Sequence, residues 1–408
     1  MAEASNPLSV LVTGGAAGLG LATARALLKR GHKVAATAPD AAGALAIRQA
    51  GALPVYPDLN RASEILSILQ LIEADALVHA APQVCCAVPQ AYAEDAAPAD
   101  RLPDVTAAVI EAATQHGVKR VISLSFAYLY DATDGAAKEG DRAVHDADYE
   151  PMLRAETLVR ESGLSGTIIR SGYIYGGHSC ETAALADAIK GSQRLPAGSR
   201  PASWIHEDDL AAAFVALLES GDSPAGIALL NAAAGAPVSP NDFCSALSDA
   251  LGLGAPRFAT SGFFSTLREK SLRDKLLERE IIIDSSALEQ QIGWAPAHTS
   301  IESGLEASAL VWRMRDAVDA DDFYNAYEDA AAVAIASFAY DVALPEPVTE
   351  TAAPAPQQEV EAAAPVKAAA PPPSDGPTPW NEDEAKREER RRKALERKAK
   401  RAARQAGG

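Results

Sequence analysis

The residues of this chain most suited to chemistry are the closely spaced glycines near its start. Residues 13–20 read TGGAAGLG, after a short aliphatic run and before a run with helical periodicity. Gly14 permits a tight turn after a strand, Gly18 lets backbone approach a diphosphate, and Gly20 permits close helix–strand packing. The first N–H groups of the following helix would then face phosphate oxygens. The segment predicts a pyrophosphate site for a dinucleotide, formed by Thr13, Gly14, Ala17, Gly18, Leu19 and Gly20.

Asp40 is the candidate for selecting the adenosine half of that dinucleotide. An acid near the end of the second strand accepts hydrogen bonds from the ribose 2′-hydroxyl of NAD, whereas a basic residue suits the 2′-phosphate of NADP. Asp40 lies 20 residues after Gly20, and residues 34–47 contain no Lys or Arg. We therefore expect NAD, with NADP not excluded. A second interpretation of Asp40, a solvated aspartate in the turn Ala-Pro-Asp, stays open.

Short aliphatic runs alternate with helical patterns along the first 170 residues, and these elements must position the glycine turn. Such alternation is typical of βαβ units, so we expect a doubly wound α/β fold with a parallel sheet and helices on both faces. The predicted strands are residues 9–13, 33–37, 54–56, 76–79, 120–123 and 166–170, and the predicted helices are residues 19–30, 44–49, 62–72, 105–115 and 152–162.

The alternation of predicted strands and helices becomes less regular after Gly172, which indicates that a different part of the chain begins there. We expect one dinucleotide-binding domain over residues 1–342, with a small α/β substrate part at about residues 173–315. Residues 343–380 are rich in Pro and Ala with little that could pack, so they are predicted to be a disordered linker. Residues 381–408 have strong helix composition and are predicted to form a charged helical tail.

Charge is distributed unevenly between the body and this tail. Residues 381–408 contain 11 Lys and Arg against 6 Asp and Glu, a net charge of +5, so the remainder of a chain of net charge −18 carries −23. The acidic body disfavours contact with nucleic acid. Two interpretations of the tail stay open: a solvated single helix, or a docking arm for an acidic protein, an anionic membrane surface or nucleic acid.

Cysteine spacing and hydropathy indicate the compartment. The start of the chain lacks the basic region of a signal peptide, and no run of about 18 apolar residues could span a membrane. The cysteines show neither CxxC nor metal-ligand spacing, so no metal site is predicted and a reducing environment is favoured. We expect a cytoplasmic protein. The cysteines are Cys85, Cys86, Cys180 and Cys244.

Further motifs follow the glycine turn in a fixed order. They are residues 58–59 (DL), 79–81 (HAA), 117–122 (GVKRVI), 169–176 (IRSGYIYG), 204–210 (WIHEDDL), 230–231 (LN) and 292–296 (IGWAP). In this order, they resemble the extended short-chain dehydrogenase/reductase family, the NAD-dependent epimerases and dehydratases, over about residues 8–312. One position departs from that branch, because Ala17 stands where its turn usually has glycine.

The resemblance implies further cofactor contacts. Asp58 and Leu59 fall on the positions where this family contacts the adenine. Ala80 and Ala81 fall on the segment after the fourth strand, which lies against the cofactor.

The resemblance also implies a catalytic constellation, from which this sequence departs. In the family a Tyr acts as general acid/base, a Lys four residues later supports it, and a Ser orients the substrate oxygen. Here the Lys position falls on Arg154, the Tyr position on Glu150 and the Ser position on Phe126. The neighbouring Tyr149 and Ser125 are therefore the candidate acid/base and orienting residues, with Arg154 as ribose clamp and positive charge.

The spacing of Tyr149 and Arg154 leaves the chemistry open. Five residues along a helix correspond to a rotation of about 140°, so the two side chains are not expected to share a face. Pro151 favours the first helical turn, which places Tyr149 just before the helix, with its phenol directed toward or away from the nicotinamide.

Two functions therefore stay open. The first is an oxidoreductase or epimerase that transfers a hydride at a carbinol carbon of a small polyol or nucleotide-sugar-type substrate. The alternative is a non-catalytic dinucleotide-binding accessory or scaffold subunit that docks through the charged helix at residues 381–408. The sequence identifies neither the substrate nor the oligomeric state.

Two other groups of polar residues have competing interpretations. His206, Asp208 and Asp209 could form a catalytic or metal cluster, but we expect a strand-to-helix junction with acids at the helix start. The Lys/Arg-rich residues 268–279, which include Arg268, Arg273 and Arg279, are interpreted either as a solvated helix face or as a site for substrate phosphates.

Overall fold

The fold is described by a computed structural model, and the described residues belong to one compact unit, Met1–Val342. The predicted linker (343–380) and charged helix (381–408) lie outside the described residues, and so does Ala81. The described ranges are residues 6–80, 101–220, 225–259 and 272–317.

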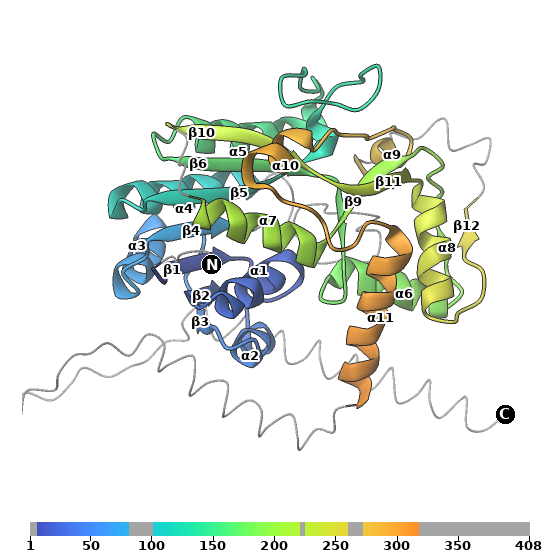
Figure 1. Cartoon of the computed structure of the whole chain (residues 1–408), viewed down its shortest axis with the longest axis horizontal. Helices are drawn as coiled ribbons and strands as arrows, with labels where there is room; N and C mark the ends of the chain where they lie inside the picture. The colour runs from blue at the N-terminus through green and yellow to red at the C-terminus, as the bar shows by residue number, and fades with distance from the viewer. Residues whose placement is uncertain (1–5, 81–100, 221–224, 260–271, 318–408) are drawn as a thin grey trace, which may run out of the picture. The chain divides into compact units, whose positions relative to one another are not determined.

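Seven parallel strands form the central sheet, in the order β10-β6-β5-β4-β1-β2-β3 (Figure 1). The order reverses between β1 and β4, and at such a switch point the strand ends leave a crevice for a ligand. The predicted doubly wound sheet is confirmed. The strands are β1 (Ser9–Thr13), β2 (Lys33–Thr37), β3 (Leu53–Val55), β4 (Ala76–His79), β5 (Arg120–Phe126), β6 (Gly166–Ser171) and β10 (Ile227–Ala232).

Helices cover both faces of this sheet, because alternate strand residues point to opposite sides. Val10 and Val12 pack into a core with α1 and α7, whereas Leu11 packs into a second core with α3, α4 and α5. α5 begins two residues earlier than predicted, with Pro151 in its first turn. The helices are α1 (Gly18–Lys29), α2 (Ala41–Gln49), α3 (Ala62–Leu71), α4 (Leu102–His116), α5 (Glu150–Arg160) and α7 (Glu207–Glu219).

A smaller part follows β6, with a core in which the indole of Trp204 stacks on Phe243 at 4.0 Å between ring centroids. Its strands form two small sheets, β11-β9-β7 and β12-β8. The elements are β7 (Tyr173–Tyr175), α6 (Cys180–Lys190), β8 (Arg194–Leu195), β9 (Ala202–His206), β11 (Ala234–Val238), α8 (Pro240–Ala250), β12 (Arg257–Phe258), α9 (Leu272–Leu277), α10 (Ser286–Ile292) and α11 (Ile301–Ala317).

The predicted substrate part, residues 173–315, is not a separate layer throughout. Its strand β10 pairs with β6 as the last strand of the central sheet, and α7 packs against α1. The chain therefore returns to the main sheet after β9, and the assignment of about residues 173–315 to a substrate part stays a prediction. Within the described ranges, no helix is long and apolar enough to cross a membrane.

Candidate cofactor and active site

The glycine turn between β1 and α1 has no room for side chains at two of its positions. A Cβ at Gly20 would collide with the carbonyl oxygen of Gly14, and one at Gly15 would lie 2.5 Å from the Cβ of Ala36. Gly14 itself has a φ of 70°, a conformation that favours glycine. Its N–H donates to Oγ1 of Thr37 at 2.9 Å. The turn is thus tight and fixed, although Gly20 packs against the turn itself rather than against the strand.

The amino end of α1 fits a diphosphate. Its N-cap residue is Ala17, no side chain caps the helix, and its first turn contains no acid. Ala17 is extended (φ −156°, ψ 172°), a conformation open to any residue, so alanine is tolerated where the extended branch usually has glycine. The N–H of Gly18 donates to the carbonyl of His178 at 2.7 Å, so the positive dipole of this helix end and the N–H groups that follow Gly18 are what suit an anion approaching over the glycine surface.

A buried histidine joins the carboxyl ends of β1 and β4 at the switch point. Nδ1 of His79 lies 2.9 Å from Oγ1 of Thr13, and its Nε2 lies 3.2 Å from Oγ1 of Thr106 on α4. Burial lowers the pKa of His79 to about 4, so its imidazole is neutral at pH 7. The contact fixes Thr13 just before the glycine turn.

The two predicted adenosine contacts are both exposed and both engaged locally. Oδ1 of Asp40 accepts a hydrogen bond from the N–H of Gly43 at 2.7 Å and caps α2, which supports the turn-aspartate interpretation. Oδ1 of Asp58 accepts from the backbone and side chain of Asn60, which lowers the pKa of this carboxyl. Leu59 is half-buried against the core beside α3. Cofactor contact by these residues stays a prediction.

A cavity lies at the carboxyl ends of β4 and β5, between α4 and α5. Its lining includes His79 and Ala80 from the end of β4, Ser125 from β5, and Met152 and Glu156 from α5. It therefore adjoins the switch point of the sheet, where ligands of doubly wound folds bind.

Ser125 belongs to a buried polar network at this cavity. Its hydroxyl donates to Oε1 of Glu156, whose two carboxylate oxygens also accept from Nε and Nη2 of Arg170 at 2.8 and 2.7 Å. The guanidinium of Arg170 lies over the ring of Tyr130, 4.4 Å from its centroid. The hydroxyl of Ser125 is thus held at the wall of the cavity.

Tyr149 lies at the start of α5 with its phenol inside the protein. The residue is 2% exposed, and its hydroxyl has no hydrogen-bond partner among the described residues. Met152 and Glu156 line the cavity, and Tyr149 is spaced three residues before Met152, so it lies next to this face at the start of the helix without being among the lining residues. The guanidinium of Arg279 lies 5.5 Å from the centroid of the Tyr149 ring.

Arg154 is not brought together with Tyr149 and Ser125. It is exposed and absent from the cavity lining, where the same helix presents Met152. The rotation of about 140° between positions 149 and 154 explains this separation. In this structure the predicted trio is therefore reduced to two members near the cavity.

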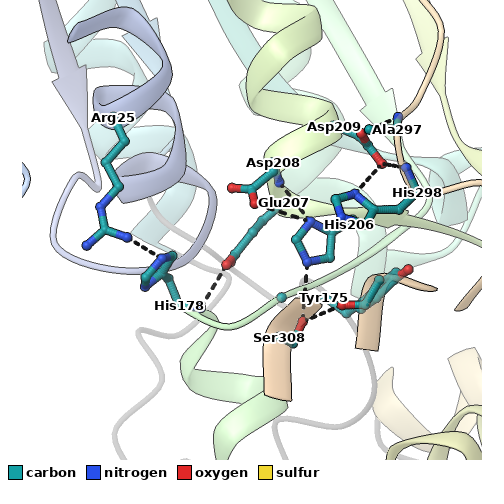
Figure 2. A network of polar contacts seen from close by, with 12 residues as sticks. Arg25, Tyr175, His178, His206, Glu207, Asp208, Asp209, Ala297, His298 and Ser308 are labelled. Carbon is teal, nitrogen blue, oxygen red and sulfur yellow. Dashed lines mark hydrogen bonds and ion pairs between the residues drawn. The ribbon is translucent and has the colours of Figure 1, made fainter. Parts of the chain in front are cut away.

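Two charged residues, Arg279 and Glu207, lie in surroundings that the sequence did not predict. Arg279 is not on a solvated face, because its guanidinium donates to the carbonyls of Tyr128 and Tyr130. Glu207, the first residue of α7, is buried beside the segment that contains His178, and burial raises the pKa of its carboxyl to about 8 (Figure 2). An acid at a helix start is ordinary in sequence, so only its burial distinguishes it.

The neighbouring residues of Glu207 form the expected strand-to-helix junction. Nδ1 of His206 accepts a hydrogen bond from the N–H of Asp208 and caps α7. The carboxylate of Asp209 accepts from the N–H groups of Ala297 and His298 at 2.7 and 3.0 Å (Figure 2). Over the described residues, no cluster of three or more His, Cys, Asp or Glu could hold a metal ion.

Comparison with known families matches residues 14–221, a little over half of the chain, to the family described as NAD(P)H-binding. The chain belongs to this NAD(P)H-binding family. Comparison with curated proteins gives no significant match. The predicted dinucleotide cofactor is thus confirmed as NAD(P).

The fold is similar to that of several solved sugar-nucleotide enzymes. UDP-glucose 4-epimerase of Thermotoga maritima is 20% identical with a TM-score of 0.61, over 76% of this chain and 99% of that one. UDP-glucuronic acid 4-epimerase of Bacillus cereus, solved with NAD, is 20% identical with a TM-score of 0.60, over 76% and 100%. dTDP-glucose 4,6-dehydratase of Streptomyces venezuelae, also solved with NAD, is 20% identical with a TM-score of 0.61, over 75% and 97%. The predicted epimerase/dehydratase-like fold is confirmed.

Proposed function

We propose that this NAD(P)-binding protein is an NAD-dependent oxidoreductase or epimerase that acts at a carbinol carbon of a nucleotide-sugar or small polyol substrate. The observation that carries the proposal is the Tyr149 phenol, buried without a partner among the described residues and three residues before Met152, which lines the cavity. The similar structures are named as enzymes of UDP- and dTDP-sugars, which supports the substrate class.

The residues of the proposed site would have separate roles. Bound NAD would supply the hydride acceptor. Tyr149 would exchange a proton with the substrate oxygen, and the hydroxyl of Ser125, held by Glu156, would orient that oxygen. The cation beside the phenol would be Arg279 rather than Arg154, since the guanidinium of Arg279 lies over the ring.

NAD is favoured over NADP by the residues after β2. Residues 34–47 contain no Lys or Arg that could pair with a 2′-phosphate. Asp40 is exposed at the start of α2, where one of its oxygens caps the helix. We therefore expect isothermal titration to give a lower Kd for NAD than for NADP.

Replacing Tyr149 by Phe tests the catalytic part of the proposal. The substitution removes only the hydroxyl, so we expect the NAD Kd to stay within about twofold while turnover falls by about 100-fold or more. Turnover would be measured by product analysis with a set of UDP- and dTDP-sugars. Unchanged turnover in Tyr149→Phe would contradict the assignment. Tight NAD binding by the natural chain without turnover of any sugar would favour the non-catalytic accessory subunit.

A further inference from the structure

Glu207 is a buried acid that the proposed reaction does not use. Its residue exposure is 1%, Oε1 accepts a hydrogen bond from the N–H of His178 at 2.7 Å, and Oε2 has no partner among the described residues. A Cβ at Gly176 would collide with the Glu207 side chain. The carboxyl is therefore enclosed by the segment 176–179.

The same segment touches the amino end of α1. The carbonyl of His178 accepts a hydrogen bond from the N–H of Gly18 at 2.7 Å, and its imidazole contacts the guanidinium of Arg25 (Figure 2). The carbonyl of Gly177 accepts from Nε1 of Trp312 at 2.8 Å. One residue of backbone thus separates the Glu207 carboxyl from the helix end that would hold the pyrophosphate.

The surroundings of Glu207 make its charge sensitive to pH. Burial raises the pKa of its carboxyl to about 8, and nearby Asp208 and Glu181 raise it as well. The His178 N–H and the Arg25 guanidinium act in the opposite direction. The carboxyl is neutral below this value and adds a buried negative charge above it.

We propose that Glu207 is a positioning residue that couples dinucleotide binding to uptake of a proton. The hydrogen bond from the His178 N–H fixes the Glu207 carboxyl one residue of backbone away from the amino end of α1, where the ionised carboxyl opposes the negative pyrophosphate and the neutral carboxyl does not. Binding to the ionised form would therefore add one proton to the Glu207 carboxylate. The inference rests on dinucleotide binding and not on hydride transfer.

The expected effect is a rise of the NAD Kd at alkaline pH. Two like charges close together in a partly buried site change an equilibrium by on the order of tenfold. We expect the Kd to be constant below about pH 7 and to rise by roughly tenfold toward about pH 9. ADP-ribose should show the same rise, and adenosine, which lacks phosphate, should show none.

Titration calorimetry of the full chain with NAD, from about pH 6 to about pH 9, tests the proposal. Two buffers of different protonation enthalpy report proton uptake directly. Glu207→Gln keeps an oxygen acceptor for His178 but cannot ionise, so its Kd should stay constant and its proton uptake should vanish. Asp208→Asn is the matched comparison, because it removes an exposed neighbouring charge that raises the pKa of Glu207 but leaves the Glu207 carboxyl in place, so the alkaline rise and the proton uptake should persist and the rise should begin at a lower pH.

Two outcomes would overturn the proposal. One is a constant Kd without proton uptake in the natural chain, a measurement that does not depend on any variant folding. The other is a folded Glu207→Gln variant that retains the alkaline rise. Neither readout requires a substrate, so absence of turnover would count against the proposed function and leave this inference standing.

Discussion

At the scale of single residues, Glu156 is the side chain on which the cavity wall depends. Its carboxylate accepts hydrogen bonds from the hydroxyl of Ser125 and, through both oxygens, from Arg170. Glu156 and Arg170 are both buried, at 5% and 3% exposed. A buried pair is stable only while each charge keeps its partner.

Replacing Glu156 by Ala should therefore destabilise the fold strongly. It leaves the Arg170 guanidinium buried without its carboxylate, and the free energy of unfolding should fall by about 3–5 kcal/mol. Urea unfolding measures the change. Arg160→Ala is the control, because Arg160 is half-exposed and pairs with the same carboxylate at 3.5 Å, a contact worth less than about 1 kcal/mol. Equal effects of the two substitutions would contradict the buried pair.

At the scale of elements, the junction of β1 and α1 depends on the absence of one side chain. Gly20 lies inside α1, where alanine would ordinarily stabilise a helix by about 0.5–1 kcal/mol. Here the added Cβ would meet the carbonyl oxygen of Gly14. The turn could accept it only by moving the N–H groups that would face the pyrophosphate.

Gly20→Ala should reverse the usual sign of a glycine-to-alanine change in a helix. We expect stability to fall by about 1–3 kcal/mol and the NAD Kd to rise by on the order of 100-fold. Thermal unfolding and calorimetric titration measure the two effects. Gly140→Ala serves as control, since nothing lies within 4 Å of its added Cβ, and it should leave the NAD Kd unchanged. A Gly20→Ala protein that binds NAD normally would refute the role of the turn.

At the scale of the whole molecule, the chain is longer than the structures it is similar to. About three quarters of it matches 97–100% of the chains of those structures. The family match covers residues 14–221, which precede the Pro/Ala-rich residues 343–380 and the basic residues 381–408, of net charge +5. Dinucleotide binding should therefore belong to the first 342 residues alone.

A chain that ends at residue 342 should bind NAD with a Kd within about twofold of that of the full chain. Its melting temperature should also be unchanged, because the described hydrophobic cores are formed by residues before 318. If residues 381–408 are a docking arm, only the full chain should sediment with anionic vesicles, and added salt should weaken that binding. Loss of NAD affinity on truncation would show that the tail belongs to the dinucleotide site.

The sequence by itself determined the elements and their connection. Strand and helix periodicities are local, so residues 9–13, 33–37 and 76–79 were predicted with the bounds that the structure has. The glycine turn was predicted for the same reason, because its conformational demands arise within eight consecutive residues. The return of β10 to the central sheet was missed, since strand pairing joins residues far apart in the chain.

Only the tertiary structure decided which side chains meet. It placed Arg154 in solvent, although Arg154 is only 5 positions from Tyr149. It placed the guanidinium of Arg279 over the ring of Tyr149, although these two residues are 130 positions apart. It also enclosed Glu207 behind the segment that touches α1. Burial and the ionisation that follows from it depend on neighbours contributed by distant segments, and no local pattern of residues encodes them.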